Sequence, residues 1–198
     1  MKQDEFRQKL IDGTIHVIAN DGLDKATTKQ IGTDTSINEA YIYRCFKGKE
    51  DMFSKTFDYL DTELEDMAMH CVSVMYDVNI SFEQRCRAFF YGVWNFLLGN
   101  KEKCLAYVRY YYSPYFKKYS CDTHKSRFKP LVEKFSIAFI GEADVWMILN
   151  HILNVVLDFA VKVHNGLMPE NDDYSEHVFR VIYASIKQYF KKPQESEA

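Results

Sequence analysis

Hydrophobic residues recur along most of the chain at intervals of three or four, which is the spacing of an amphipathic helix. The first stripe is formed by Phe6, Leu10, Ile11, Ile15 and Ile18. It ends at Gly22, which can take the left-handed conformation that closes a helix. Comparable stripes predict further helices over residues 28–34, 39–46, 49–76, 81–99, 102–113, 127–140, 143–164 and 175–191. The polar stretch 117–125 is expected to be a loop, and the pattern as a whole predicts an all-α protein of about nine helices with no strand.

Two short predicted helices near the N-terminus fit a helix-turn-helix, in which the outer face of the second helix stays free. Thr27 or Thr28 can cap the first and Asn38 the second, because their side-chain oxygens can accept a free N–H of the first turn. The residues that can point inward are Ile31, Ile37, Ile42 and Phe46. Those left mostly outward are Glu39, Ala40, Tyr41, Tyr43 and Arg44. Exposed tyrosines are unusual on a helix that only packs, and they suit contacts with sugar, phosphate or a thymine methyl.

These residues resemble the DNA-binding domain of the tetracycline-repressor (TetR) family. The family pattern is a TT-x-x-IA opening, a G-V-S turn and then G-T-L-Y-x-y-F-x-s-K-e-x-L. At those positions, with no insertion, this chain has Thr27, Thr28, Ile31, Gly32, Ser36, Ile37, Asn38, Ala40, Tyr41, Ile42, Tyr43, Phe46, Lys49, Glu50 and Met52. The resemblance covers about residues 5–57, and beyond them only the length and the helical pattern match. The alternative is that this segment is simply a compact three-helix unit of an all-α protein.

Three positions depart from the family pattern. Gly32 replaces the usual small Ala, which preserves close packing but weakens the helix by about 1 kcal/mol. Ser36 replaces the turn glycine, so a left-handed backbone there would carry strain. Tyr41 replaces a usual Thr, which changes the expected base contacts.

The resemblance implies a helix-turn-helix DNA-binding domain over 1–48 and an effector-binding and dimerisation domain over 49–198. Phosphate contacts are implied for Thr28, Tyr43 and Lys49, the last at a helix start that favours an anion, and further phosphate candidates are Arg44 and Lys47. Contacts with bases or the groove wall are implied for Lys29, Glu39, Ala40 and Tyr41. Between residues 28 and 55, five basic residues stand against four acidic ones, so we expect few phosphate contacts per subunit and little non-specific binding.

Aromatic residues crowd the segment 81–139. The resemblance implies an effector pocket in this larger half, and a pocket of aromatic rings with a few polar groups suits an apolar or cationic small molecule. The aromatic candidates for its lining are Tyr91, Trp94, Tyr107 and Tyr111. The alternative for each of them is the core, where an aromatic stripe at helical spacing usually lies.

A polar stripe interrupts the otherwise apolar helix expected over 143–164. Asn150, Asn154 and Asp158 recur every four residues and share one face, with His151 beside them. Buried amides and carboxylates need partners, so the stripe could line the effector pocket, pair across a dimer interface or face water.

The last predicted helix carries a stripe of Val178, Val181, Ile182, Ser185, Ile186 and Tyr189. The resemblance implies that the last two helices form a four-helix bundle with their counterparts in a second subunit. Such a homodimer has twofold symmetry and would suit a palindromic operator. The helix could equally pack in the core of its own chain.

Composition narrows the class of partner and the compartment. The net charge of −3 and pI of about 6.1 argue against a protein that coats nucleic acid, so DNA binding must rest on a local patch. The five cysteines, Cys45, Cys71, Cys86, Cys104 and Cys121, are scattered and form no CxxC pair, which favours free thiols in a cytoplasmic protein. The sequence has no apolar signal region at its start and no uncharged run of about 18 apolar residues, so no membrane segment is expected.

No motif of a catalytic, phosphate-binding or metal site occurs, so we expect no enzyme activity, no cofactor and no metal. The sequence therefore predicts a cytoplasmic, ligand-responsive transcription regulator. We expect it to act as a repressor that binds a palindromic double-stranded DNA operator as a homodimer and is released by a small-molecule effector. The alternative is a helical small-molecule or acyl-chain binding protein that has lost specific DNA binding.

Overall fold

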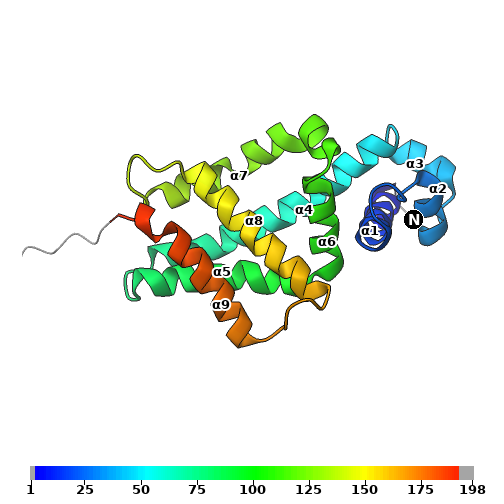
Figure 1. Cartoon of the computed structure of the whole chain (residues 1–198). Coiled ribbons are helices and arrows are strands. Elements are labelled where there is room, and N and C mark those ends of the chain that lie inside the picture. The colour runs from blue at the N-terminus through cyan, green and yellow to red at the C-terminus, as the bar shows by residue number, and fades with distance from the viewer. Residues whose placement is uncertain (1–2, 192–198) are drawn as a thin grey trace, which may run out of the picture. The chain divides into compact units, whose positions relative to one another are not determined.

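The computed structural model describes residues 3–191, and this part of the chain folds into α-helices joined by short turns (Figure 1). The nine α-helices found there are α1 (Gln3–Asp21), α2 (Thr28–Thr35), α3 (Glu39–Cys45), α4 (Lys49–Cys71), α5 (Phe82–Gly99), α6 (Lys101–Tyr111), α7 (Cys121–Ser136), α8 (Val145–His164) and α9 (Asp172–Ile186). Three shorter helical segments are η1 (Val72–Tyr76), η2 (Phe116–Ser120) and η3 (Lys187–Tyr189). In this described range, β pairing is limited to an isolated bridge between Phe139 and Phe190. The prediction of an all-α protein of about nine helices is confirmed.

The chain divides into two compact units. Of the described residues, the first unit comprises 3–66 and 97–127, and the second comprises 67–96 and 128–191. The first unit thus contains α1, α2, α3 and α6, and the second contains α8 and α9. This division concerns compactness, and the functional boundary expected after residue 48 stays a prediction.

The core of the first unit begins on the inner face of α1. Leu10, Ile11, Ile15 and Ile18 are buried, as their spacing predicts, and Phe6 is half-buried. The four residues predicted to point inward from α2, the turn and α3 are also buried: Ile31, Ile37, Ile42 and Phe46. The other side of α1 lies against α6, where the Arg109 guanidinium donates a 2.6 Å hydrogen bond to the backbone carbonyl of Ile18. This packing holds the three N-terminal helices as one body and leaves the outer face of α3 open.

The expected loop over 117–125 is wrong. Residues 116–120 form the π-helical segment η2, and α7 begins at Cys121 and runs to Ser136, short of the predicted end at residue 140. The stretch looks like a loop because two of its inward positions, Ser120 and His124, are polar. Both are buried, and each has a hydrogen-bond partner in the core, so burial costs them little.

The core of the second unit lies where α5, α8 and α9 supply apolar side chains. Trp94 of α5 is buried, its ring stacks on Phe90 at 5.6 Å, and its Nε1–H donates to the Ser175 hydroxyl of α9 at 2.8 Å. The last predicted stripe is divided between two faces. Val178, Ile182 and Ile186 are buried, whereas Val181 is 56% exposed and Ser185 is also exposed.

Helix α8 is apolar but only partly covered by its own chain. Among the described residues it is long and apolar enough to span a membrane, with a mean hydropathy of 1.4 over its most apolar window and 22% of that window buried. It nevertheless carries Asp158 and Lys162, which form an ion pair at 2.7 Å. Length and composition do not separate a membrane span from the interface helix of an oligomer.

Candidate nucleic-acid interface

The helix-turn-helix is held by caps at both of its helices. The Thr27 hydroxyl accepts a 3.1 Å hydrogen bond from the Gln30 N–H, and the Asn38 side-chain oxygen accepts one of 2.9 Å from the Ala40 N–H. Of the two candidates at the start of α2, Thr27 is therefore the cap, and the prediction of Asn38 for α3 is confirmed. These caps fix where each helix starts and hence which residues α3 presents outward.

The turn between α2 and α3 is tight. Ser36 adopts the left-handed conformation, with φ 56° and ψ 32°, which is the backbone at which a side chain is expected to carry strain and a glycine would fit better. A Cβ added at Gly32 would lie 2.9 Å from the backbone oxygen of Ile37, too close for a carbon at that position. Glycine at 32 therefore allows the backbone after the turn to approach α2.

The outer face of α3 is exposed as predicted. Ile42 is fully buried, whereas Tyr43 is 60% exposed and Tyr41 is 39% exposed. Glu39, Ala40 and Arg44 are exposed as well. A short helix that buries one residue and presents five polar, aromatic or small ones has a surface available for a groove.

Two interactions already order this face. The Thr28 hydroxyl donates a 2.5 Å hydrogen bond to a carboxylate oxygen of Glu39, which ties the start of α2 to the start of α3. The guanidinium carbon of Arg44 lies 4.8 Å from the centroid of the Tyr41 ring. Lys29 is exposed near this face, on the first turn of α2.

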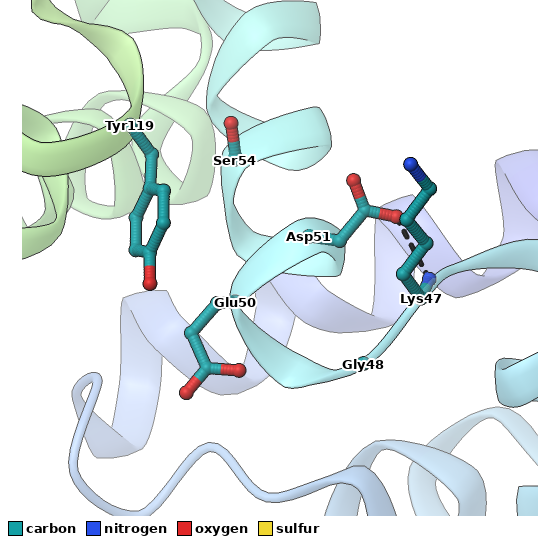
Figure 2. Close-up of a pocket in the computed structure, with 6 residues that line it drawn as sticks. All are labelled: Lys47, Gly48, Glu50, Asp51, Ser54 and Tyr119. Carbon is teal, nitrogen blue, oxygen red and sulfur yellow. Dashed lines mark hydrogen bonds between the residues drawn. The ribbon is translucent and has the colours of Figure 1, made fainter.

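The start of α4 brings two more lysines to the same body. The Lys47 backbone N–H donates to the Asp51 carboxylate at 2.9 Å (Figure 2). Lys49 Nζ lies 5.1 Å from the centroid of the Phe53 ring. Beside them is a pocket of about 310 Å³ lined by Lys47, Gly48, Glu50, Asp51, Ser54 and Tyr119. Figure 2 shows Tyr119 and the Glu50 carboxylate on one side of the start of α4, with Lys47 and Asp51 on the other. The polar lining of this pocket differs from the mostly apolar lining typical of small-molecule sites.

Deeper in the first unit lies a buried polar group that we call the Asp61 cluster: Asp61, Tyr107, His124 and Arg127. The fully buried Asp61 carboxylate accepts hydrogen bonds from the Tyr107 hydroxyl at 3.0 Å, His124 Nδ1 at 2.8 Å and the Arg127 guanidinium at 2.5 Å. Arg127 also pairs with Asp58. Burial, and then the negative charge of Asp61, raises the pKa of Tyr107 well above its usual value.

Two predicted pocket residues lie together here: Tyr107, which belongs to this cluster, and Tyr111. Their rings stack with centroids 5.8 Å apart, and the Tyr111 ring meets the His124 ring edge-on at 5.6 Å. Burial raises the pKa of Tyr111 to about 12. Asp61, His124 and Arg127 were not predicted from the sequence, although Asp61 falls four residues after Phe57 and three before Leu64, within the apolar stripe of α4. A charge within such a stripe is a signal that could have identified the cluster.

The remaining pocket candidates belong to the second unit. Trp94 is a core residue, and Tyr91 is half-buried with a pKa raised by that burial and by Glu176. The exposure of the polar stripe changes along α8. Asn150 and Asn154 are half-buried, and Asp158 is 58% exposed in its pair with Lys162. His151 is exposed, and its Nε2 lies 3.0 Å from the Ser185 hydroxyl of α9. A ligand-binding role for these residues stays a prediction.

Comparison with known proteins agrees with the helix-turn-helix geometry. Residues 10–56 match the family described as bacterial regulatory proteins, tetR family. No curated protein sequence matches the chain.

Solved structures of similar fold cover nearly the whole chain. A TetR family transcription regulator from Marinobacter aquaeolei is 15% identical and has a TM-score of 0.76. The alignment covers 93% of this chain and 98% of that protein. A putative tetR family transcription regulator from Shewanella sp. is 11% identical, with a TM-score of 0.74 over 97% of this chain and 100% of its own. The multidrug binding protein EbrR, complexed with imidazole, is 11% identical, with a TM-score of 0.64 over 96% of this chain and 98% of its own.

Proposed function

We propose that the chain, whose residues 10–56 match the tetR family and whose fold is that of TetR family regulators, is a repressor of this family that binds a palindromic operator as a homodimer and is released by a small-molecule effector. The observation that carries this proposal is the exposed outer face of α3, above a capped helix-turn-helix with its apolar side buried. We propose cytoplasmic action, since the operator lies on the chromosome.

The proposed DNA contacts follow from what each exposed side chain can offer. Phosphates are assigned to Thr28, Tyr43, Arg44, Lys47 and Lys49, because hydroxyls and cations bind phosphate oxygens. Lys29, Glu39, Ala40 and Tyr41 are assigned to positions that face either the bases or the groove wall. The hydroxyl of Thr28 already donates to Glu39, so a phosphate contact through Thr28 requires that hydrogen bond to open. Few cations and a net charge of −3 support a weak non-specific component.

The dimer and the effector are assigned to the larger half. The partly covered apolar helix α8, with its exposed Met147, and the exposed Val181 of α9 support an interface with a second copy. Stacked Tyr107 and Tyr111 over the Asp61 carboxylate support an apolar or cationic effector. EbrR, which has a similar fold, is described as a multidrug binding protein, and this description supports the proposal of a small-molecule effector.

The test is selection of bound sequences from random double-stranded DNA by the purified full chain, followed by affinity measurements at several salt concentrations. We expect a palindromic sequence to be enriched and its affinity to fall with salt. Lys49→Ala should weaken binding and reduce the slope of log affinity against log salt by about 0.9 for each phosphate that is no longer neutralised, or about 2 for a dimer that loses one contact in each subunit. Tyr43→Ala should also weaken binding.

Lys129→Ala is the matched control, because Lys129 is an exposed lysine of α7, outside the helix-turn-helix. It should bind the selected sequence as the unaltered protein does. Equal effects of Lys49→Ala and Lys129→Ala would contradict the proposed site. Failure to enrich any sequence would favour the alternative of a helical small-molecule binding protein without a DNA-reading role.

A further inference from the structure

The ring of Tyr41 is held between two elements of the DNA-binding domain. It stacks on the ring of Phe6, from the first turns of α1, with centroids 5.2 Å apart and an interplanar angle of 16°. The Arg44 guanidinium lies over the same ring at 4.8 Å. From these contacts we infer that Tyr41 is a positioning residue, which braces Arg44 against α1 for a phosphate contact and does not itself read a base. This inference rests on the proposed function of DNA binding.

The contacts that hold the Tyr41 ring begin with α1. Phe6 is half-buried and therefore anchored on its own helix. The next residue, Arg7, places its guanidinium 5.3 Å from the centroid of Phe46, which is buried at the far end of α3. Two consecutive residues of α1 thus contact rings from both ends of the α3 segment. This arrangement fixes the orientation of α3 and makes the Tyr41 ring part of that packing.

The stack matters for Arg44 because an arginine side chain has many rotamers. A free exposed arginine loses much of that freedom when it binds a phosphate, which weakens the contact. A guanidinium that already rests on an aromatic face has fewer conformations left to lose, and its charge is attracted by the ring. Tyr41 therefore strengthens a phosphate contact that another residue makes.

The same packing argues against base reading by Tyr41. Phe6 and Arg44 both contact the ring, so moving the ring into the groove would cost the ring stack and the cation–π interaction. Tyr43, two positions along the helix, is 60% exposed against 39% for Tyr41, so it is the tyrosine better placed for DNA. The substitution of the usual family Thr by Tyr41 then changes how α3 is held and leaves base recognition to its neighbours.

The test compares variants of the full chain on the selected operator, with the salt slope and the preference at each operator base as separate readouts. Arg44→Ala should weaken binding by about 10-fold and lower the salt slope by about 0.9 for each phosphate that is no longer neutralised. Tyr41→Ala should weaken binding and lower the slope in the same direction, and should add little on the Arg44→Ala background. Tyr41→Phe should bind normally, because the ring and not the hydroxyl forms the stack. Neither Tyr41 variant should change the base preference.

A different pattern would overturn the inference. Loss of preference at one operator base in Tyr41→Ala or Tyr41→Phe, with an unchanged salt slope, would identify Tyr41 as a base reader. Additive effects of Tyr41→Ala and Arg44→Ala would show that the two residues act independently. Phe6→Leu, which keeps an apolar side chain but removes the stack, should weaken binding, and normal binding by this variant would overturn the role of α1.

These outcomes are distinct from failure of the proposed function. If Lys49→Ala weakens operator binding while the Tyr41 variants behave normally, the positioning role is wrong and DNA binding stands. If no sequence is enriched at all, the proposed function and the positioning role both fail.

Discussion

At the scale of single residues, Asp61 is a charge with no exposed surface whose three partners come from other helices. Tyr107 belongs to α6, while His124 and Arg127 belong to α7. A buried carboxylate is tolerated because each of these groups offers it a hydrogen bond, and Arg127 offers an opposite charge. The arginine also contacts Asp58. The cluster thus connects α4, α6 and α7 through a single acceptor group.

Asp61→Asn should lower the free energy of unfolding by about 2 to 4 kcal/mol. The amide removes the charge opposite Arg127, whose side chain is 17% exposed, and replaces one of the two acceptor oxygens with an NH₂ donor. Urea unfolding at fixed protein concentration measures the change. Glu133→Gln, in an exposed 4.0 Å pair with Lys129, is the control and should stay within about 0.5 kcal/mol. A loss at Asp61 no larger than that of the control would contradict the structural importance of the cluster.

At the scale of elements, the turn between α2 and α3 carries local strain. Ser36 closes α2 in the left-handed region, and its N–H donates to the backbone oxygen of Thr33 at 3.2 Å. A side chain in this conformation costs roughly 1 kcal/mol relative to glycine. The turn persists because the caps of α2 and α3 and the buried Ile37 fix the chain on both sides.

Ser36→Gly should therefore raise the free energy of unfolding by about 0.5 to 1 kcal/mol, since relief of strain exceeds the added entropy of the unfolded chain. Thermal and urea unfolding measure this gain, and operator affinity should stay unchanged. Ser36→Ala removes the hydroxyl but keeps the Cβ, so it should give no comparable gain. Equal stability of the glycine and alanine variants would show that the left-handed backbone is not strained.

The elements that the sequence predicts well are those whose signals are local. The stripe of α1 and the cap at Asn38 follow from neighbouring residues, and both occur as expected. The prediction for the segment 117–125 is wrong because Ser120 and His124 are buried by virtue of partners outside that segment, Tyr110 and Asp61. The spacing of hydrophobic and polar residues within one helix gives no information about hydrogen-bond partners outside it.

In the candidate site, too, features set by local spacing could be predicted and features set by tertiary contacts could not. The inward and outward residues of α3 follow from a four-residue spacing, so the exposed face could be predicted. The stack of Phe6 on Tyr41 could not, because it joins residues 35 positions apart and depends on how α1 packs against α3. Tertiary contacts of this kind decide what an exposed side chain is free to do.

At the scale of the whole molecule, one surface of the second unit joins α8 and α9. Met147 of α8 and Val181 of α9 are both more than half exposed, and His151 meets Ser185 between the two helices at 3.0 Å. Exposed apolar side chains on neighbouring helices are typical of a surface covered by another protein. A second copy of this chain would supply the same surface about a twofold axis, as a palindromic operator requires.

Val181→Asp should therefore convert a dimer into the 23.4 kDa monomer, because the twofold axis would bring two carboxylates into an apolar interface. Sedimentation velocity measures the mass, and affinity for the palindrome should fall with it. Val78→Asp is the matched control, since Val78 is 82% exposed and lies outside α8 and α9, and it should remain dimeric. A Val181→Asp protein that stays dimeric and binds the palindrome normally would place the interface elsewhere.

Inserting about 5 base pairs, half a helical turn, between the half-sites should weaken binding of the unaltered protein, because the two α3 helices of the proposed dimer could no longer face the same side of the DNA.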